Sequence, residues 1–277
     1  VMLQTVPMDG TIAIGYDGSR ESGRLPRGMK VGTGIAPELD VAVDVVEGVQ
    51  LLAEGRGNAL SVIAAADPGA LFDPGPIRYM DKIAAGPAAG KVIDIGASVE
   101  QNLRAIARAT RKDLDDLTIV VLDRPRHADL IDQVRATGAR IRLIAHGDVA
   151  GALMPAVEET GIDALFGTGG ALEGIIAACA LKCLGGAIVA RLAPRDDAER
   201  TAAAAVGVDA SRVLGTDDLV AGDNVFFAAS GITNGELLRG VQYYGGGART
   251  QSVTMRSRSG TVRMVEGRHR WDKLMQI

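Results

Sequence analysis

The feature that most constrains this chain is an alternation of short, apolar, β-rich runs with helical patterns. In 277 residues, this texture predicts an α/β protein in which helices cover mixed sheets. Since 47% of the residues are hydrophobic but only 3% are aromatic, we expect a core of Ala, Val, Ile and Leu. The clearest predicted strands are residues 11–15, 41–45, 59–66, 117–123, 140–145, 164–167 and 225–230.

The strongest predicted helices are residues 99–111, 128–136 and 171–184. Ser98 and Gln101 form a capping-box pattern before the first of them, and Gly138 and Gly185 end the other two. Residues 250–265 alternate and predict a hairpin that turns at 259–260.

A domain boundary is predicted between residues 113 and 114, where a charged stretch precedes a fresh alternation of strands and helices. This gives an N-terminal lobe, 1–113, and a C-terminal lobe, 114–277, for a length that suits two lobes.

Charge and hydropathy limit the expected partners and compartment. The formal charge is −4 and no basic block is present, so we expect no nucleic-acid partner. The longest apolar stretch, residues 59–66 interrupted by Ser61, is far below the roughly 20 residues that span a bilayer. Cys179 and Cys183 lie four apart in a predicted helix, where a disulfide has poor geometry and two core thiols are the plain reading. These patterns predict a cytoplasmic protein without a membrane anchor.

One acidic string is a candidate metal site. Asp40 and Asp44 point to the same face of a predicted strand, and Glu47 and Gly48 follow near its end. Clustered carboxylates suit Mg²⁺ or Mn²⁺, which prefer oxygen ligands. A strand end with solvated acids is the alternative, and the spacing alone slightly favours it.

Two further strings follow predicted strands. Arg124 and Arg126 lie between a strand and a helix, where they could hold a phosphate, although surface arginines in a turn are the alternative. The glycines at 167, 169 and 170 precede Glu173 in a possible phosphate cradle, but the GxGxxG pattern is absent and a tight turn suffices. His146, after another strand, is a candidate acid-base group.

Taken in order, these strings resemble the class II fructose-1,6-bisphosphatases, in particular the actinobacterial branch. The resemblance runs through nearly the whole chain. Its most specific segments are residues 67–74 (DPGALFDP), 79–83 (YMDKI), 122–127 (LDRPRH), 186–200 (GAIVARLAPRDDAER) and 252–264 (SVTMRSRSGTVRM).

The resemblance implies a layered αβαβα sandwich of the lithium-sensitive sugar-phosphatase type, with Mg²⁺ or Mn²⁺ and a sugar phosphate or bisphosphate between the lobes. It also implies a homodimer or homotetramer, and an N-terminal lobe shortened because the match begins inside the family's pattern. By position, the metal ligands would be Asp44, Glu47 and Glu173, and the sugar phosphate would contact Gly48, Tyr79, Arg124, Arg126, Gly147, Asp148 and Gly170.

Departures from the family's pattern fall on its chemistry. Tyr16 and Asp17 stand in a string where the family has two glutamates, and Arg20 stands near an expected aspartate. Val49 replaces a hydroxyl expected to orient the attacking water, and His146 replaces an aspartate. The pattern therefore predicts that the standard hydrolysis is weak or lost.

Three hypotheses remain open from the sequence. The chain is an active phosphatase with a rebuilt metal site in which Asp17 replaces a lost glutamate, or a sugar-phosphate-binding sensor or partner without hydrolytic activity. In the third, it is an enzyme for other sugar or cyclitol phosphate chemistry, with Tyr16, Arg20 and His146 as catalytic candidates.

Overall fold

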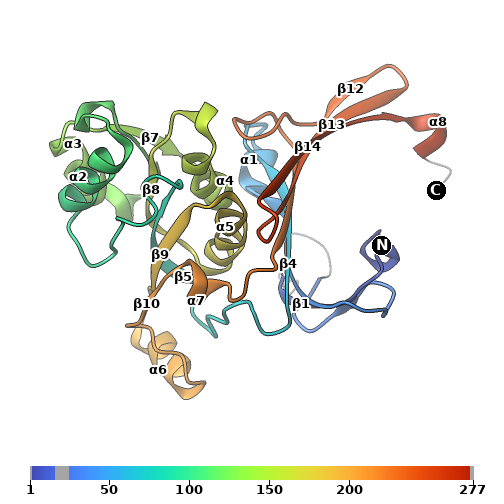
Figure 1. Cartoon of the computed structure of the whole chain (residues 1–277), viewed down its shortest axis with the longest axis horizontal. Helices are drawn as coiled ribbons and strands as arrows, with labels where there is room; N and C mark the ends of the chain where they lie inside the picture. Colours follow the sequence, from blue (N-terminus) through green and yellow to red (C-terminus); the bar gives the residue numbers. More distant parts are fainter. Residues whose placement is uncertain (1, 16–24, 275–277) are drawn as a thin grey trace.

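The computed structural model describes residues 2–15 and 25–274 and confirms a layered α/β sandwich with two mixed sheets (Figure 1). The eight-stranded sheet has the order β12 (Gln242–Tyr244), β13 (Gly247–Arg256), β11 (Phe226–Gly231), β4 (Leu60–Ala66), β3 (Glu38–Glu47), β1 (Asp9–Ile14) and β2 (Lys30–Val31), with β14 (Thr261–Arg270) paired to β13. The six-stranded sheet has the order β10 (Val213–Leu214), β9 (Ala187–Leu192), β5 (Tyr79–Ala85), β8 (Ala164–Gly170), β6 (Thr118–Leu122) and β7 (Arg140–Ile144).

Helices form layers beside and between the sheets. In Figure 1, α2 and α3 lie outside the six-stranded sheet, whereas α4 and α5 lie between the two sheets. The helices are α1 (Val49–Ala53), α2 (Val99–Thr110), α3 (Ala128–Ala136), α4 (Asp148–Leu153), α5 (Ala171–Leu184), α6 (Asp197–Ala205), α7 (Thr216–Leu219) and α8 (Trp271–Leu274). Short 3₁₀ turns span Met2–Thr5, Leu114–Asp116, Pro125–His127, Met154–Ala156 and Glu158–Thr160.

The largest core fills the space between the sheets. Helix α5 is buried on almost all sides, which explains why its sequence is apolar all round rather than amphipathic. Cys179 and Cys183 are both buried and free, and burial raises the pKa of Cys179 to about 12 and that of Cys183 to about 11. These thiols are therefore packing groups rather than nucleophiles.

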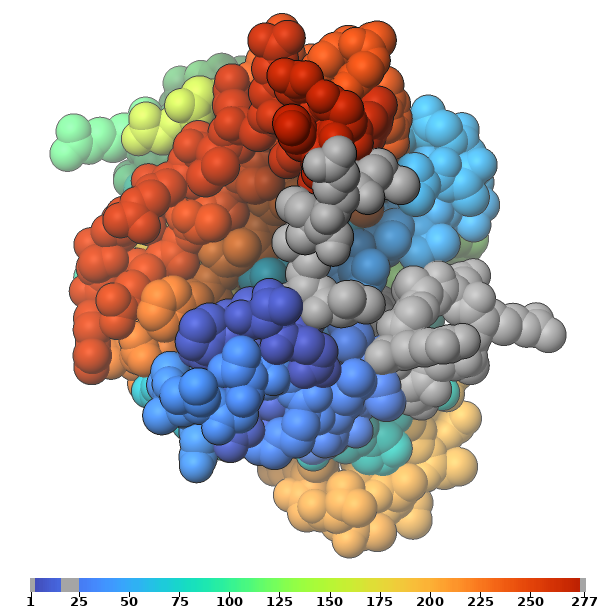
Figure 2. Space-filling model, turned by 90° about the vertical axis from the view of Figure 1, so that its right-hand side faces the viewer, coloured from blue at the N-terminus to red at the C-terminus, as the bar shows by residue number. Residues whose placement is uncertain are grey.

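Local sequence signals predicted several elements well. Helices α3 and α5 have the predicted bounds, and the capping box of Ser98 and Gln101 is present at α2. The predicted hairpin is the pair β13 and β14, which forms a diagonal ridge in the space-filling view (Figure 2). Strands β5 and β9 were missed, and both lie inside the six-stranded sheet.

The sheets do not divide at residues 113 and 114. Strand β5 precedes that point but belongs to the six-stranded sheet, whereas β11 and β13 follow it and belong to the eight-stranded sheet. The proposed division into lobes stays a prediction. Among the described residues, no helix is both long and apolar enough to cross a membrane.

Candidate functional site

A cavity of about 370 Å³ lies where several strands end. Its lining includes the predicted metal ligands Asp44, Glu47 and Glu173, the predicted sugar-phosphate contacts Gly48, Tyr79, Arg124, Arg126, Gly147, Asp148 and Gly170, and the acid-base candidate His146. The other candidates, Tyr16, Asp17 and Arg20, lie outside the described residues.

Strand ends and left-handed glycines bring these side chains together. The pairing of β3 with β4 shifts register between Asp44 and Glu47, and Gly48, at φ +83°, then starts α1. Gly147, at φ +102°, starts α4 in the same way. Because only glycine adopts such values without strain, each strand turns at once into a helix and leaves its polar side chains at the cavity. Asp40, by contrast, accepts the Gly69 N–H at 2.7 Å and does not line the cavity.

Glu47 is the most perturbed acid of the site. Its Oε1 accepts the Val149 N–H at 3.2 Å, while the buried Oε2 has no hydrogen-bond partner among the described residues. Burial is the main cause that raises the pKa of Glu47 to about 8; the carboxylates of Asp44, Asp148 and Glu173 add to the effect, and the Val149 N–H opposes it. A buried acid surrounded by other acids is a position that a cation would stabilise.

Glu173 lies in the first turn of α5, where the helix dipole favours a negative charge. A Cβ atom at Gly170 would lie 1.7 Å from Glu173 Oε2. Only glycine therefore allows this carboxylate to fold back over the start of the helix.

Asp148 is held by two neighbours. Its Oδ2 accepts the Gly170 N–H at 2.9 Å and a bond from Lys82 Nζ at 2.7 Å, whereas the buried Oδ1 has no partner in the described chain. A buried polar atom without a partner in a cavity wall calls for a ligand or water.

His146 and Arg124 contact each other. Arg124 Nη2 lies 3.0 Å from His146 Nδ1 and 3.4 Å from Nε2, and since a guanidinium only donates hydrogen bonds, a ring nitrogen of His146 accepts. Burial lowers the pKa of His146, and the charge of Arg124 lowers it further. The contact with Arg124 therefore favours the neutral form of His146, which holds one cation of the cavity in place.

Arg126 is the second cation. It donates to the Thr168 carbonyl from Nη2 at 2.8 Å and lies 5.5 Å from the centre of the Tyr79 ring. The backbone of Thr168 is in turn held by buried His127, whose Nε2 accepts the Thr168 N–H at 2.8 Å. The cavity thus combines carboxylates with two fixed guanidinium groups.

Two residues that support the site had not been singled out from the sequence. His127 carried no signal beyond its neighbours, whereas Lys82 could have been found as a lysine directly before an apolar run, residues 83–85. Its side chain is 1% exposed.

The predicted metal ligands Asp44, Glu47 and Glu173 do not bring three ligand atoms within 4.8 Å of one another. Among the described residues, only Asp113, Asp115 and Asp116 bring three ligand atoms within 4.8 Å of one another, and all three are exposed. Their spacing would allow a cation, but the cavity wall, with buried Asp44 and Glu47 and partly buried Glu173, offers the more suitable surroundings.

Comparisons with known proteins cover both scaffold and cavity. A family model described as "Bacterial fructose-1,6-bisphosphatase, glpX-encoded" matches residues 1–269. The "Fructose-1,6-bisphosphatase class 2" of Haemophilus influenzae is 39% identical over 289 residues, which is 100% of this chain and 86% of that protein. The "Fructose-1,6-bisphosphatase 1 class 2" of Escherichia coli K12 is 37% identical over 286 residues, or 99% of this chain and 85% of that protein.

Proposed function

Because the chain belongs to the class II fructose-1,6-bisphosphatase family, we propose that its cavity binds a sugar phosphate or bisphosphate together with Mg²⁺ or Mn²⁺. The observation that carries this proposal is the convergence of carboxylates and arginines on one cavity of about 370 Å³, a size typical of small-molecule sites. Cytoplasmic localisation and assembly into dimers or tetramers remain predictions.

The residues present fit a divalent cation. Glu47 Oε2 is buried without a partner among the described residues, and oxygen donors are what Mg²⁺ and Mn²⁺ prefer. Asp44, Glu47 and Glu173 would hold the ion, which when bound would withdraw charge from a phosphoryl oxygen.

Arg124 and Arg126 would bind a phosphate group. Charge-assisted hydrogen bonds of this kind contribute about 1.5–3 kcal/mol each. Arg126 reaches the cavity over Tyr79, whose ring would contact the sugar. Gly147 and Gly170 line the cavity. Gly147 leaves room for the ligand near its backbone, whereas the space beside Gly170 is occupied by the Glu173 carboxylate.

Hydrolysis of fructose 1,6-bisphosphate should be weak. Val49 lines the cavity where the family pattern has a hydroxyl, and without that hydroxyl the attacking water loses a positioning hydrogen bond. His146, bonded to Arg124, occupies the place of an expected aspartate.

The test compares binding with turnover. Calorimetric titration with fructose 1,6-bisphosphate and Mn²⁺ should show binding, while phosphate release should be slow and should rise in Val49→Thr, which restores a hydroxyl at nearly constant volume. Absence of sugar-phosphate binding would overturn the proposal. Turnover in the ordinary range of about 1–10³ s⁻¹ would show that hydrolysis is intact.

Two alternative functions are separated by the same experiment. Binding without turnover of any substrate would support a sensor or partner protein, an alternative favoured by the neutral, arginine-bound state of His146. Phosphate release from another sugar or cyclitol phosphate would instead support the repurposed enzyme.

A further inference from the structure

Lys82 is a buried cation directly behind the cavity wall. It lies within β5, its side chain is 1% exposed, and its ammonium group is 2.7 Å from Asp148 Oδ2. It also donates to the Gly170 carbonyl at 3.1 Å. Burying an ammonium group is costly unless it is paired and hydrogen-bonded, so these contacts are needed for Lys82 to be accommodated at all.

The pair binds both backbone polar groups of Gly170. Lys82 binds its carbonyl, and Asp148 Oδ2 accepts its N–H at 2.9 Å. Gly170 is the residue before α5, and Asp148 is the first residue of α4. The approach is so close that a Cβ atom at Gly169 would lie 1.8 Å from Asp148 Oδ2. One ion pair therefore joins β5, α4 and α5 at the cavity.

The two carboxylate oxygens of Asp148 differ in their partners. Oδ2 is occupied by Lys82 and Gly170, whereas the buried Oδ1 has no partner among the described residues. Asp148 lines the cavity and Lys82 does not. We propose that Lys82 is a positioning residue that fixes Asp148 so that its Oδ1 accepts a hydrogen bond from a hydroxyl group of the bound sugar phosphate. This role rests on the proposed function.

The charge of Lys82 also separates two roles among the carboxylates of the cavity, binding of the sugar and binding of the cation. Asp148 shares the cavity with Asp44, Glu47 and Glu173, and without a counter-charge it would become a further ligand for a divalent cation. Lys82 supplies that counter-charge from behind the wall. Asp148 is thereby kept for the sugar while the other acids serve the cation.

The experiment measures the two affinities separately on the full chain. Calorimetry with fructose 6-phosphate at saturating Mn²⁺ should show binding weakened about 10- to 100-fold in Lys82→Met, the equivalent of one hydrogen bond to a charged group. Titration with Mn²⁺ alone should show an affinity that is unchanged or tighter. A merely structural role would weaken both, because Glu47 and Glu173 are tied to α4 and α5.

A double-mutant cycle tests whether Lys82 acts through Asp148. Asp148→Asn should weaken fructose 6-phosphate binding as much as Lys82→Met, and the double variant should bind no more weakly than Asp148→Asn. The double variant also removes both buried charges, so it keeps the test open if Lys82→Met does not fold. Further weakening in the double variant would overturn the proposal.

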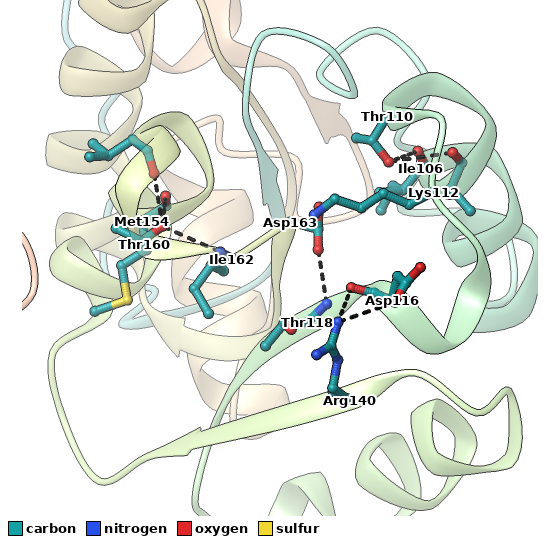
Figure 3. A network of polar contacts seen from close by, with 12 residues as sticks. Ile106, Thr110, Lys112, Asp116, Thr118, Arg140, Met154, Thr160, Ile162 and Asp163 are labelled. Atoms are coloured by element: carbon teal, nitrogen blue, oxygen red, sulfur yellow. Dashed lines mark hydrogen bonds and ion pairs between the residues drawn. The ribbon is translucent and has the colours of Figure 1, made fainter.

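Lys112→Met is the matched control. Its ammonium group forms an ion pair of the same length, 2.7 Å, with Asp163 Oδ1 (Figure 3), and neither residue lines the cavity. This variant should bind fructose 6-phosphate like the wild type. Equal binding by Lys82→Met and the wild type would overturn the positioning role alone, whereas a wild-type chain that binds no sugar phosphate would overturn the proposed function and this role with it.

Discussion

A lysine–aspartate ion pair lies at each end of strand β8, and the two pairs differ in how many oxygens of the aspartate have a hydrogen-bond partner. At its start, Asp163 is paired with Lys112, and Figure 3 shows the surrounding polar network. At its end, Asp148 is paired with Lys82 across Gly170. Both ammonium groups lie 2.7 Å from their carboxylates.

The difference lies in the second carboxylate oxygen. Asp163 Oδ2 accepts the Thr118 N–H at 2.9 Å, so both of its oxygens have partners. Asp148 Oδ1 has none among the described residues. A complete set of hydrogen bonds is sufficient to explain a structural pair, whereas an incomplete set inside a cavity indicates a place kept for a ligand.

Removing the cation at the cavity end should have the largest effect on stability. Lys82→Met leaves a buried carboxylate without its counter-charge, and breaking such a pair costs about 3–5 kcal/mol. Urea unfolding at pH 7 without added metal would measure this loss. A loss no larger than that of Lys112→Met would remove the distinction between the two ends.

The cavity end should also make stability depend on pH. Glu47 has a pKa of about 8 in the folded chain, against an ordinary value of 4.5. Between these values the folded state holds a proton that the unfolded state has released, so the free energy of unfolding should fall as pH rises through this window. One pKa unit corresponds to about 1.4 kcal/mol, which predicts a fall of about 3.5 kcal/mol between pH 5 and pH 8 in the metal-free protein.

Comparing the wild type with Glu47→Gln isolates this contribution. Unfolding curves in EDTA at pH 5 and pH 8 should show the smaller pH dependence in the variant, because glutamine does not titrate. Parallel curves for the two proteins would contradict the raised pKa.

A methyl group at the cavity end should cost about 2 kcal/mol, within the range for overpacking. In Gly169→Ala the new Cβ would meet Asp148 Oδ2 at 1.8 Å, so the carboxylate must turn away from Lys82. Gly161→Ala, near the start of β8, is the control: its Cβ would meet nothing within 4 Å, and only the strain of φ +64° opposes it. Thermal unfolding that ranks the two variants in the opposite order would show that Asp148 moves freely.

The smallest effect on the free energy of unfolding is expected at the start of β8, where both oxygens of Asp163 have partners. In Lys112→Met, Asp163 keeps its bond from Thr118, and the Lys112 side chain is 38% exposed, so water replaces part of what is lost. We expect a loss of about 1 kcal/mol in urea unfolding. A loss equal to that of Lys82→Met would show that neither the burial of the lysine nor the hydrogen bond to the second carboxylate oxygen makes the two ion pairs differ in their contribution to stability.

Local sequence signals predicted the bounds of helices and strands better than they predicted which side chains meet in the folded chain. The bounds of α3 and α5 follow from their terminal glycines and apolar content. Strand β5 was missed because Asp81 and Lys82 interrupt its apolar pattern, and only the tertiary structure reveals that Lys82 is buried against Asp148. A charge inside a strand is read as exposure unless its partner, distant in sequence, is known.

The sequence segments that form the site could be predicted, but the contacts between their side chains could not. Each string had a structural explanation of its own, and the family resemblance was what joined them before the cavity was seen. Sequence spacing could not show that His146 contacts Arg124 or that Asp148 contacts Lys82, because these contacts depend on how the strand ends meet. The roles assigned to the lining residues stay predictions.

The composition of the two sheets has a consequence for the order of folding. The six-stranded sheet uses strands from a continuous segment, residues 79–214, whereas the eight-stranded sheet joins residues 9–66 to residues 226–270. During synthesis, β4 must therefore wait for β11, its neighbour through the register Val62↔Ala229. Pairings between strands distant in sequence form slowly and leave strand edges open. We therefore expect the six-stranded sheet to form first. The strands of residues 9–66 should need protection from aggregation until β11 and the hairpin of β13 and β14 have been synthesised.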